Sequence, residues 1–186
     1  MATGGLVPRR IENPVQGDAI TFLETSAESG GERSLLAMEV VPGGKVTPHF
    51  HTSYSEHFFV REGRLTVEIG ESRHDLGPGD DEAVSPGTRH AWRNDGSVPV
   101  QADLELRPGH SGFEDSLRMV YGLAADGRVT ASGLPRNPLH TALVLNWADI
   151  RLPGAQSALT PVLRLFTGLA RMTGVERRLR LRYLSH

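Results

Sequence analysis

Between residues 19 and 106 the chain is a succession of short segments with strand character, each closed by a turn signal. Segments such as AITFLETS (19–26) and RSLLAMEVV (33–41) are rich in aliphatic and β-branched residues, and Gly, Pro, Asn and Asp separate them from their neighbours. Alternating β-α units would need a helix-length stretch between successive strands. This density of turn residues therefore predicts an all-β core with antiparallel strands, arranged as a sandwich or a barrel.

Two adjacent segments in this region have the pattern of a hairpin. EHFFVREG (56–63) and RLTVEIG (64–70) are both strand-like, and Glu62-Gly63 lies between them. Glycine next to a polar residue is a common hairpin turn because it tolerates positive φ. We expect the two strands to pair with each other.

The pattern changes after Pro108, where apolar residues recur at helical spacing. A helix is expected over 113–125, a second begins with Asn137 as N-cap and Pro138 at its first position, and a third begins at Thr160-Pro161. The terminal stretch VERRLRLRYL (175–184) alternates at period two in part and fits either a helix or a strand. We expect an N-terminal arm over 1–18, a β-core over 19–110 and a helical extension over 111–186.

Charge is distributed unevenly along the chain. Residues 151–186 hold seven Arg and one acid, a net charge of +6, and because the whole chain carries −2 the remainder carries −8. The acidic body gives no support for nucleic-acid binding. The basic helices have three interpretations, which are packing on the core or covering its mouth, forming a dimer contact, or lying on an anionic membrane surface. Packing and a homodimer are expected, and membrane association is not.

The chain contains no cysteine. A bound metal must therefore be held by His, Asp or Glu, and a reducing compartment is consistent with this composition. We see neither a signal-peptide pattern nor an apolar stretch long enough to span a bilayer. We expect a cytoplasmic protein.

Four residues are candidates for holding such a metal. His49 and His51 are two apart, so on a strand they share a face with roughly 6.6 Å of rise between them. Glu56 follows a polar, turn-like stretch, so we expect it to open the next strand and to point back inward. His90 lies well downstream and must come from a partner strand. A set that is partly local and partly remote suits a site inside a β-scaffold.

The two blocks that hold these residues resemble the sequence motifs of the cupin family. The first motif, G-x5-H-x-H-x4-E-x6-G, is matched at every fixed position by Gly43, His49, His51, Glu56 and Gly63. The second, G-x5-P-x-G-x2-H-x3-N, is matched except at Ser85, which stands where the motif has proline; the matching residues are Gly79, Gly87, His90 and Asn94. The resemblance covers residues 33–106.

This resemblance implies an antiparallel jelly-roll barrel with one divalent metal ion inside. The implied ligands are His49, His51, Glu56 and His90. Fe(II) is the expected ion, with Mn(II), Ni(II), Cu(II) and Zn(II) as alternatives, because imidazole and carboxylate ligands select only weakly among these metals.

Parity along the strands suggests which side chains surround the ion. Phe58 and Val60 share the parity of Glu56, Trp92 shares that of His90, and Met38 faces the same space. These residues are candidate substrate-pocket walls, although ordinary core packing is the commoner role for apolar side chains. Tyr54, in the loop between ligands, either gates the site, hydrogen-bonds a substrate, or is an exposed loop tyrosine.

The resemblance implies a metal-dependent enzyme that acts on a small organic molecule. Oxygenation of the quercetinase-like dioxygenase type is the first expectation, with Glu56 also acting as a catalytic proton acceptor. A redox-neutral isomerase or a polyketide-type cyclase is the alternative within enzymes. A cupin that binds a small molecule without catalysis is the alternative from another class.

Overall fold

The computed structural model describes residues 9–184. In this part of the chain the strands precede the helices, as expected. The strands are β1 (Arg10–Asn13), β2 (Asp18–Glu24), β3 (Ser34–Val40), β4 (Lys45–His49), β5 (Ser55–Glu62), β6 (Leu65–Ile69), β7 (Ser72–Leu76), β8 (Asp81–Val84), β9 (His90–Arg93) and β10 (Val100–Arg107).

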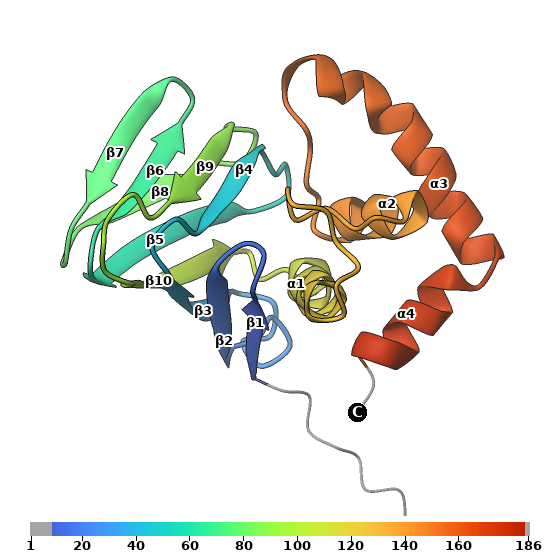
Figure 1. The fold of residues 1–186 in the computed structure, drawn as a ribbon, viewed down its shortest axis with the longest axis horizontal. Helices are drawn as coiled ribbons and strands as arrows, with labels where there is room; N and C mark the ends of the chain where they lie inside the picture. Colours follow the sequence, from blue (N-terminus) through green and yellow to red (C-terminus); the bar gives the residue numbers. More distant parts are fainter. Residues whose placement is uncertain (1–8, 185–186) are drawn as a thin grey trace, which may run out of the picture.

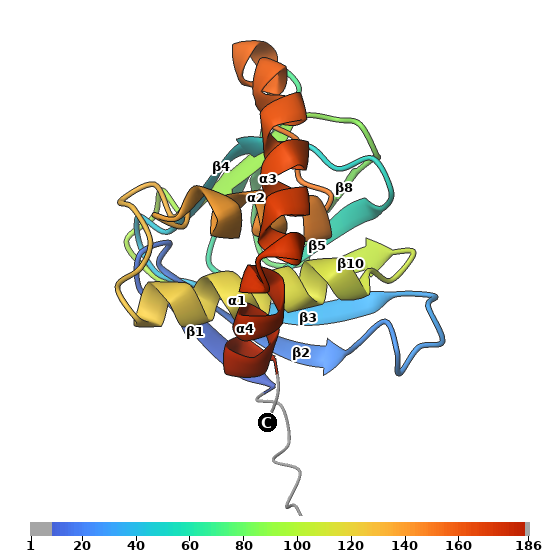
Figure 2. The same cartoon turned by 90° about the vertical axis from the view of Figure 1, so that its right-hand side faces the viewer.

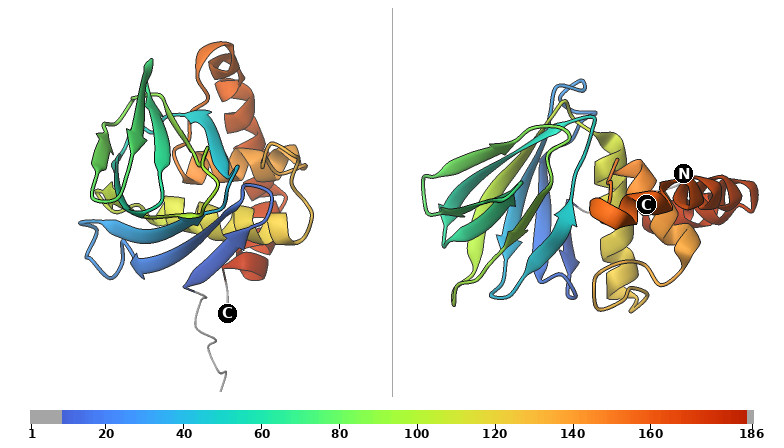
Figure 3. Two further views of the ribbon diagram at one scale, coloured as in Figure 1. Left: turned by 60° about the vertical axis from the view of Figure 1, so that its left-hand side comes forward. Right: turned by 90° about the horizontal axis from the view of Figure 1, so that it is seen from above.

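The strands form two antiparallel sheets that face each other (Figure 1; Figure 3, right). One sheet has the order β1-β2-β3-β10-β5-β8 and the other has the order β4-β9-β6-β7. Inward side chains of both sheets build a shared apolar core that includes Phe22, Leu36, Phe58 and Leu65. The predicted all-β core with jelly-roll architecture is confirmed.

The predicted hairpin between residues 56–63 and 64–70 is wrong. β5 pairs with β10 and β8, whereas β6 pairs with β7 and β9 in the other sheet. Gly63 has φ of 77°, and a Cβ at this position would lie 2.6 Å from the carbonyl oxygen of Pro99. The turn at Gly63 therefore carries the chain across the core instead of folding it back on itself.

Residues of β5 alternate between the core and the outer face. Glu56, Phe58 and Val60 are buried, while Phe59 lies on the outer face and His57 is half-buried. This is the parity predicted from the sequence, because successive side chains of a strand point to opposite faces.

The helices all lie on one side of the sheets (Figure 1; Figure 3, right). They are α1 (Ser111–Ala125), α2 (Pro138–Trp147), the 3-10 helix η1 (Gly154–Leu159), α3 (Thr160–Met172) and α4 (Val175–Tyr183). The predicted N-cap is confirmed, since the Asn137 side chain accepts a 2.9 Å hydrogen bond from the amide of Leu139. α1 packs against β1 and connects the sheets to the other helices.

The two C-terminal helices run along the outside of this layer (Figure 2). The stretch 175–184 is mainly helical, and Leu179 of α4 packs into a second apolar cluster with α1 and α2. The apolar side chains of α3 are only partly buried, because Ala170 is enclosed whereas Val162 and Leu169 are 45% and 43% exposed. The homodimer stays a prediction.

The segment expected to be an N-terminal arm contributes to the sheet. Residues 1–8 lie outside the described part of the chain. Arg10–Asn13 forms β1, which pairs with β2 from Arg10 opposite Thr21 to Asn13 opposite Asp18. Between residues 9 and 184, none of the helices has both the length and the apolar character needed to cross a membrane.

Candidate metal centre and adjoining cavity

The four residues singled out in the sequence meet between the two sheets. His49 ends β4 and lies directly opposite His90, the first residue of β9. His51 follows β4 by two residues, and Glu56 reaches in from β5 of the facing sheet. All four are buried, with exposed fractions of 2–8%.

The side chains are close enough to share one ion. Ligand nitrogens of His49, His51 and His90 all lie within 4.8 Å of one another. Glu56 Oε1 is 3.4 Å from Nε2 of His51, and Glu56 Oε2 is 3.0 Å from Nε2 of His90. The structure thus brings together the four residues of the predicted ligand set.

Backbone carbonyls fix the orientation of two of the imidazoles. Nδ1 of His49 lies 2.9 Å from the carbonyl oxygen of Thr47, and Nδ1 of His90 lies 3.0 Å from that of Thr88. A carbonyl oxygen only accepts, so Nδ1 carries the hydrogen and donates it. The lone pair of each neutral ring is then on Nε2, the atom available to a metal.

The imidazole of His51 is held by a side chain and a backbone carbonyl together. Nδ1 of His51 lies 2.5 Å from the hydroxyl of Tyr54 and 3.2 Å from the carbonyl oxygen of Ala148. The Tyr54 hydroxyl in turn donates a 2.7 Å hydrogen bond to Ala148. Ala148 follows α2, so the helical extension helps to orient a candidate ligand.

Within the part of the chain that the structure describes, the Nε2 atoms of two of these histidines make no hydrogen bond. Nε2 of His51 and Nε2 of His90 are buried and have no hydrogen-bond partner among the described residues. Both face the carboxylate of Glu56, and two lone pairs opposite a carboxylate repel unless a cation or a proton lies between them. Three imidazoles and a carboxylate in this arrangement fit a divalent metal ion.

The protonation states of His49 and Glu56 suit metal binding, whereas at His90 the lowering effect of burial is outweighed by Glu56, which raises the pKa. Burial, together with the neighbouring rings of His90 and His51, lowers the pKa of His49 to about 3. Burial alone would raise the pKa of Glu56, but the adjacent His51 and His90 outweigh it and hold that pKa well below its ordinary value. A neutral imidazole and an ionised carboxylate are the forms that bind a metal.

Tyr54 is a candidate pocket residue by its place in the sequence, and its position differs from the expectation. It is 1% exposed, not an exposed loop residue, and it does not line the cavity described below. Its ring packs beside the His51 ring at a centroid distance of 4.5 Å. Tyr54 therefore orients a candidate ligand.

Tyr54→Phe is expected to weaken divalent-metal binding about 10-fold, because losing an outer-shell partner of a ligand typically costs roughly 10- to 100-fold in affinity. Competition against a chromophoric chelator measures this change. Tyr183→Phe, at a hydroxyl that donates to Asp126 on the helical layer, is the matched control. Equal affinities of the two variants would show that Tyr54 does not orient His51.

Asp149 ties the loop between the ligands to the end of α2. Its Oδ2 accepts hydrogen bonds from the Thr52 amide at 2.8 Å, the Thr52 hydroxyl at 2.7 Å and the Ser53 hydroxyl at 2.9 Å. Although partial burial opposes it, these hydrogen bonds lower the pKa of Asp149 to about 2. Sequence reasoning missed this residue because no motif or spacing links it to Thr52.

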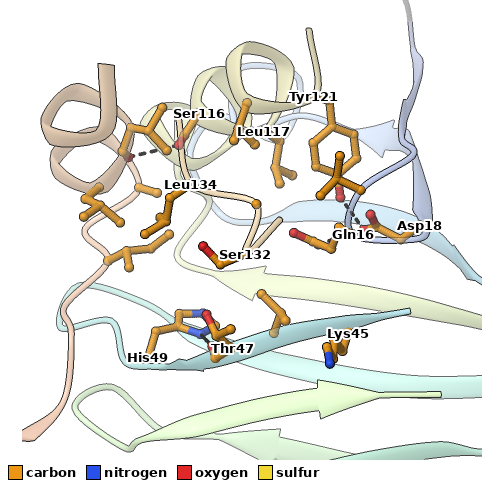
Figure 4. Close-up of a pocket in the computed structure, with 18 of the residues that line it drawn as sticks. Gln16, Asp18, Lys45, Thr47, His49, Ser116, Leu117, Tyr121, Ser132 and Leu134 are labelled. Carbon is orange, nitrogen blue, oxygen red and sulfur yellow. Dashed lines mark hydrogen bonds between the residues drawn. The ribbon is translucent and has the colours of Figure 1, made fainter. Parts of the chain in front are cut away.

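A cavity of about 190 Å³ opens onto the candidate metal centre. His49 and Glu56 form part of its wall, and most of the other lining side chains are apolar. Figure 4 shows that the walls come from the strands, from α1 and α2, and from the loop that carries Ser132 and Leu134. The helical extension, which no motif covers, therefore builds much of the pocket.

Of the residues proposed from the sequence as pocket walls, Met38 and Trp92 line this cavity. Phe58 and Val60 do not, and both are packed in the core instead. The physical reason is the rise of the strand, which moves each successive inward side chain of β5 roughly 6.6 Å further from Glu56.

The cavity wall also carries a polar cluster that the sequence did not reveal. Asp18 of β2 is 6% exposed, and its Oδ2 accepts hydrogen bonds from the Tyr121 hydroxyl and, at 3.1 Å, from Nε2 of Gln16. Burial raises the pKa of Asp18 to about 6, against the lowering effect of both hydrogen bonds.

This shift predicts a pH dependence of stability. The folded-state pKa of about 6 lies above the ordinary value of 3.8, so the folded protein binds this proton more tightly than the unfolded chain. Stability from this group is present below about pH 4 and is lost as the pH rises through about 6. Asp18→Asn cannot titrate and should lose less stability across that window. Urea denaturation at several pH values measures the difference, and parallel curves would contradict it.

Comparisons with known proteins agree with this architecture. The model of the Cupin_2 family, the cupin domain, matches residues 36–106. Protein SchB from Streptomyces halstedii is 27% identical over 97 residues, covering 52% of this chain and 70% of SchB. The tetracenomycin polyketide synthase protein TcmJ from Streptomyces glaucescens is 29% identical over 94 residues, covering 50% of this chain and 63% of TcmJ.

A solved structure, KdgF from Halomonas sp., aligns with a TM-score of 0.47 and 17% identity, covering 53% of this chain and 84% of that one. The family match lies within the strands that form the two-sheet jelly roll, from β3 to β10. Residues 36–106 therefore match the cupin domain family.

Proposed function

We propose that this protein is a metal-dependent cupin enzyme that acts on a small, largely apolar molecule of the polyketide type. We propose further that its reaction is a redox-neutral proton transfer that leads to isomerisation or ring closure. The observation that carries this proposal is the apolar cavity whose wall includes His49 and Glu56 of the candidate metal centre. The likeness to TcmJ, which is named a polyketide synthase protein, supports the substrate class.

In this proposal some residues bind the metal, one accepts a proton, and others pack against the substrate. His49, His51, His90 and Glu56 would hold the ion, with Fe(II) the expected metal. A bound divalent ion would supply Lewis-acid polarisation of a substrate carbonyl.

Glu56 is one of two carboxylates on the described cavity wall, and the one adjoining the candidate metal centre. In this proposal Glu56 loosens from the ion and accepts a proton from a substrate carbon next to a carbonyl group. Met38, Trp92 and Phe113 line the cavity and would pack on the apolar body of the substrate while excluding water.

Oxygenation is the second candidate. The donor set of three imidazoles and one carboxylate, enclosed in an apolar pocket, also suits a redox-active ion such as Fe(II). The two reactions differ in their demand for dioxygen, so they are separable by experiment.

The test is turnover of aromatic polyketide mimics by protein loaded with metal under anaerobic conditions, followed by mass spectrometry of the product. We expect a product of unchanged mass, or lighter by one water, that forms without dioxygen and is absent with His51→Ala. Oxygen uptake with a product that gains oxygen would overturn the redox-neutral reaction in favour of the oxygenase. Binding without turnover in either atmosphere would show a small-molecule-binding cupin.

A further inference from the structure

The proposed reaction uses only one end of the cavity. His49 and Asp18 lie on different sides of it (Figure 4). A substrate that reaches the candidate metal centre and fills the cavity also meets the cluster formed by Gln16, Asp18 and Tyr121.

We propose that Asp18 is a specificity-determining residue, which binds a hydrogen-bond donor such as a phenolic hydroxyl on the part of the substrate remote from the metal centre. The inference rests on the proposed function for the identity of the substrate. The binding preference itself is measurable without any turnover.

In the described part of the chain, the hydrogen bonds of Asp18 leave one of its two oxygens without a partner. Tyr121 and Gln16 both donate to Oδ2. Oδ1 is buried and has no hydrogen-bond partner among the described residues. A buried acceptor without a donor is costly, and a donor from a bound molecule would remove that cost.

The position of Asp18 agrees with this role. Its carboxylate is turned toward Tyr121 and Gln16, which line the same cavity (Figure 4). The burial that raises its pKa to about 6 also strengthens any hydrogen bond it accepts when ionised. In the described part of the cavity wall, Asp18 and Glu56 are the two carboxylates, and Glu56 faces the histidines.

The lining around Asp18 indicates the chemical class of the ligand. Ile20, Leu117 and Val120 line the cavity together with Met38 and Trp92. Such walls suit a flat, apolar ring system, and a single buried acceptor suits one hydroxyl at its edge. A hydroxylated aromatic compound therefore suits this part of the wall.

Asp18→Asn tests the inference with little change in shape. Tyr121 and Gln16 would still donate to one side of the residue, so the amide oxygen takes the place of Oδ2. The amide NH₂ group then replaces Oδ1 and offers a donor where the wild type offers an acceptor. The variant should therefore prefer a ligand that accepts a hydrogen bond over one that donates it, which is the reverse of the wild type.

The probes are 2-naphthol, which donates a hydrogen bond, and its methyl ether, which only accepts. Calorimetric titration of the zinc-loaded wild type is expected to show about 10-fold tighter binding of the naphthol, since a hydrogen bond to a charged acceptor is stronger than one to a neutral acceptor. Asp18→Asn should bind the ether at least as tightly as the naphthol. Tyr121→Phe should show a smaller preference for the naphthol than the wild type.

His51→Ala separates this inference from the proposed function. It alters the metal centre and leaves Asp18 in place, so the preference for 2-naphthol should persist. An equal preference in wild type and Asp18→Asn would overturn the role of Asp18. Failure of the wild type to bind either probe would overturn the proposed ligand class, and loss of the preference in His51→Ala would assign it to the metal centre.

Discussion

His51→Ala is expected to lower the affinity for divalent metal by more than roughly 100-fold, a larger loss than that caused by removing an outer-shell partner. The variant deletes one of three nitrogens that lie within 4.8 Å of one another and leaves Glu56 with a single imidazole neighbour. Equilibrium dialysis followed by elemental analysis measures the bound metal. The wild type should retain about one ion per chain, by the ligand count of one site.

His57→Ala is the matched control for this variant. His57 is adjacent to Glu56 on β5, but it is half-buried on the outer side, where it pairs with Asp81 at 2.7 Å. Its loss should leave the metal content unchanged. A metal content that falls equally in both variants would show that unfolding, and not loss of a ligand, explains the result.

Phe58→Ala is expected to destabilise the fold by about 3–5 kcal/mol, the usual cost of truncating a buried phenylalanine. Phe58 has 0% exposure and lies in β5, between β10 and β8. Removing its ring leaves a void where both sheets meet. Urea denaturation, with the midpoint and slope fitted separately, measures the free energy of unfolding.

Phe59→Ala provides the comparison on the same strand. Phe59 is 36% exposed on the opposite face, where its ring packs beside that of His57. We expect a loss of roughly 1 kcal/mol or less, because exposed side chains contribute little to stability. Similar losses at the two positions would contradict the assignment of the inner and outer faces of β5.

Local sequence patterns predicted the parts of the structure that depend on local spacing. The alternation of Glu56, Phe58 and Val60 follows from the geometry of any strand, and the N-cap at Asn137 follows from backbone groups one turn away. The ligand set was identified from two blocks of fixed spacing, and the structure brings His49, His51, Glu56 and His90 together.

The parts that were missed depend on contacts between distant segments. The turn at Gly63 has the residue pattern of a hairpin, and only the pairing of β5 with β10 shows that it crosses between sheets. Asp18 and Tyr121 are 103 residues apart, and Thr52 and Asp149 are 97 apart. No periodicity connects such pairs, so the cavity wall and the support of His51 by Ala148 became visible only in the structure.

Crystallography of the metal-loaded protein at the absorption edge of its metal locates the ion directly. We expect a single strong anomalous peak within bonding distance of Nε2 of His49, His51 and His90 and of the carboxylate of Glu56. A peak at other residues, or no peak between the two sheets in protein that binds metal stoichiometrically in solution, would contradict this expectation.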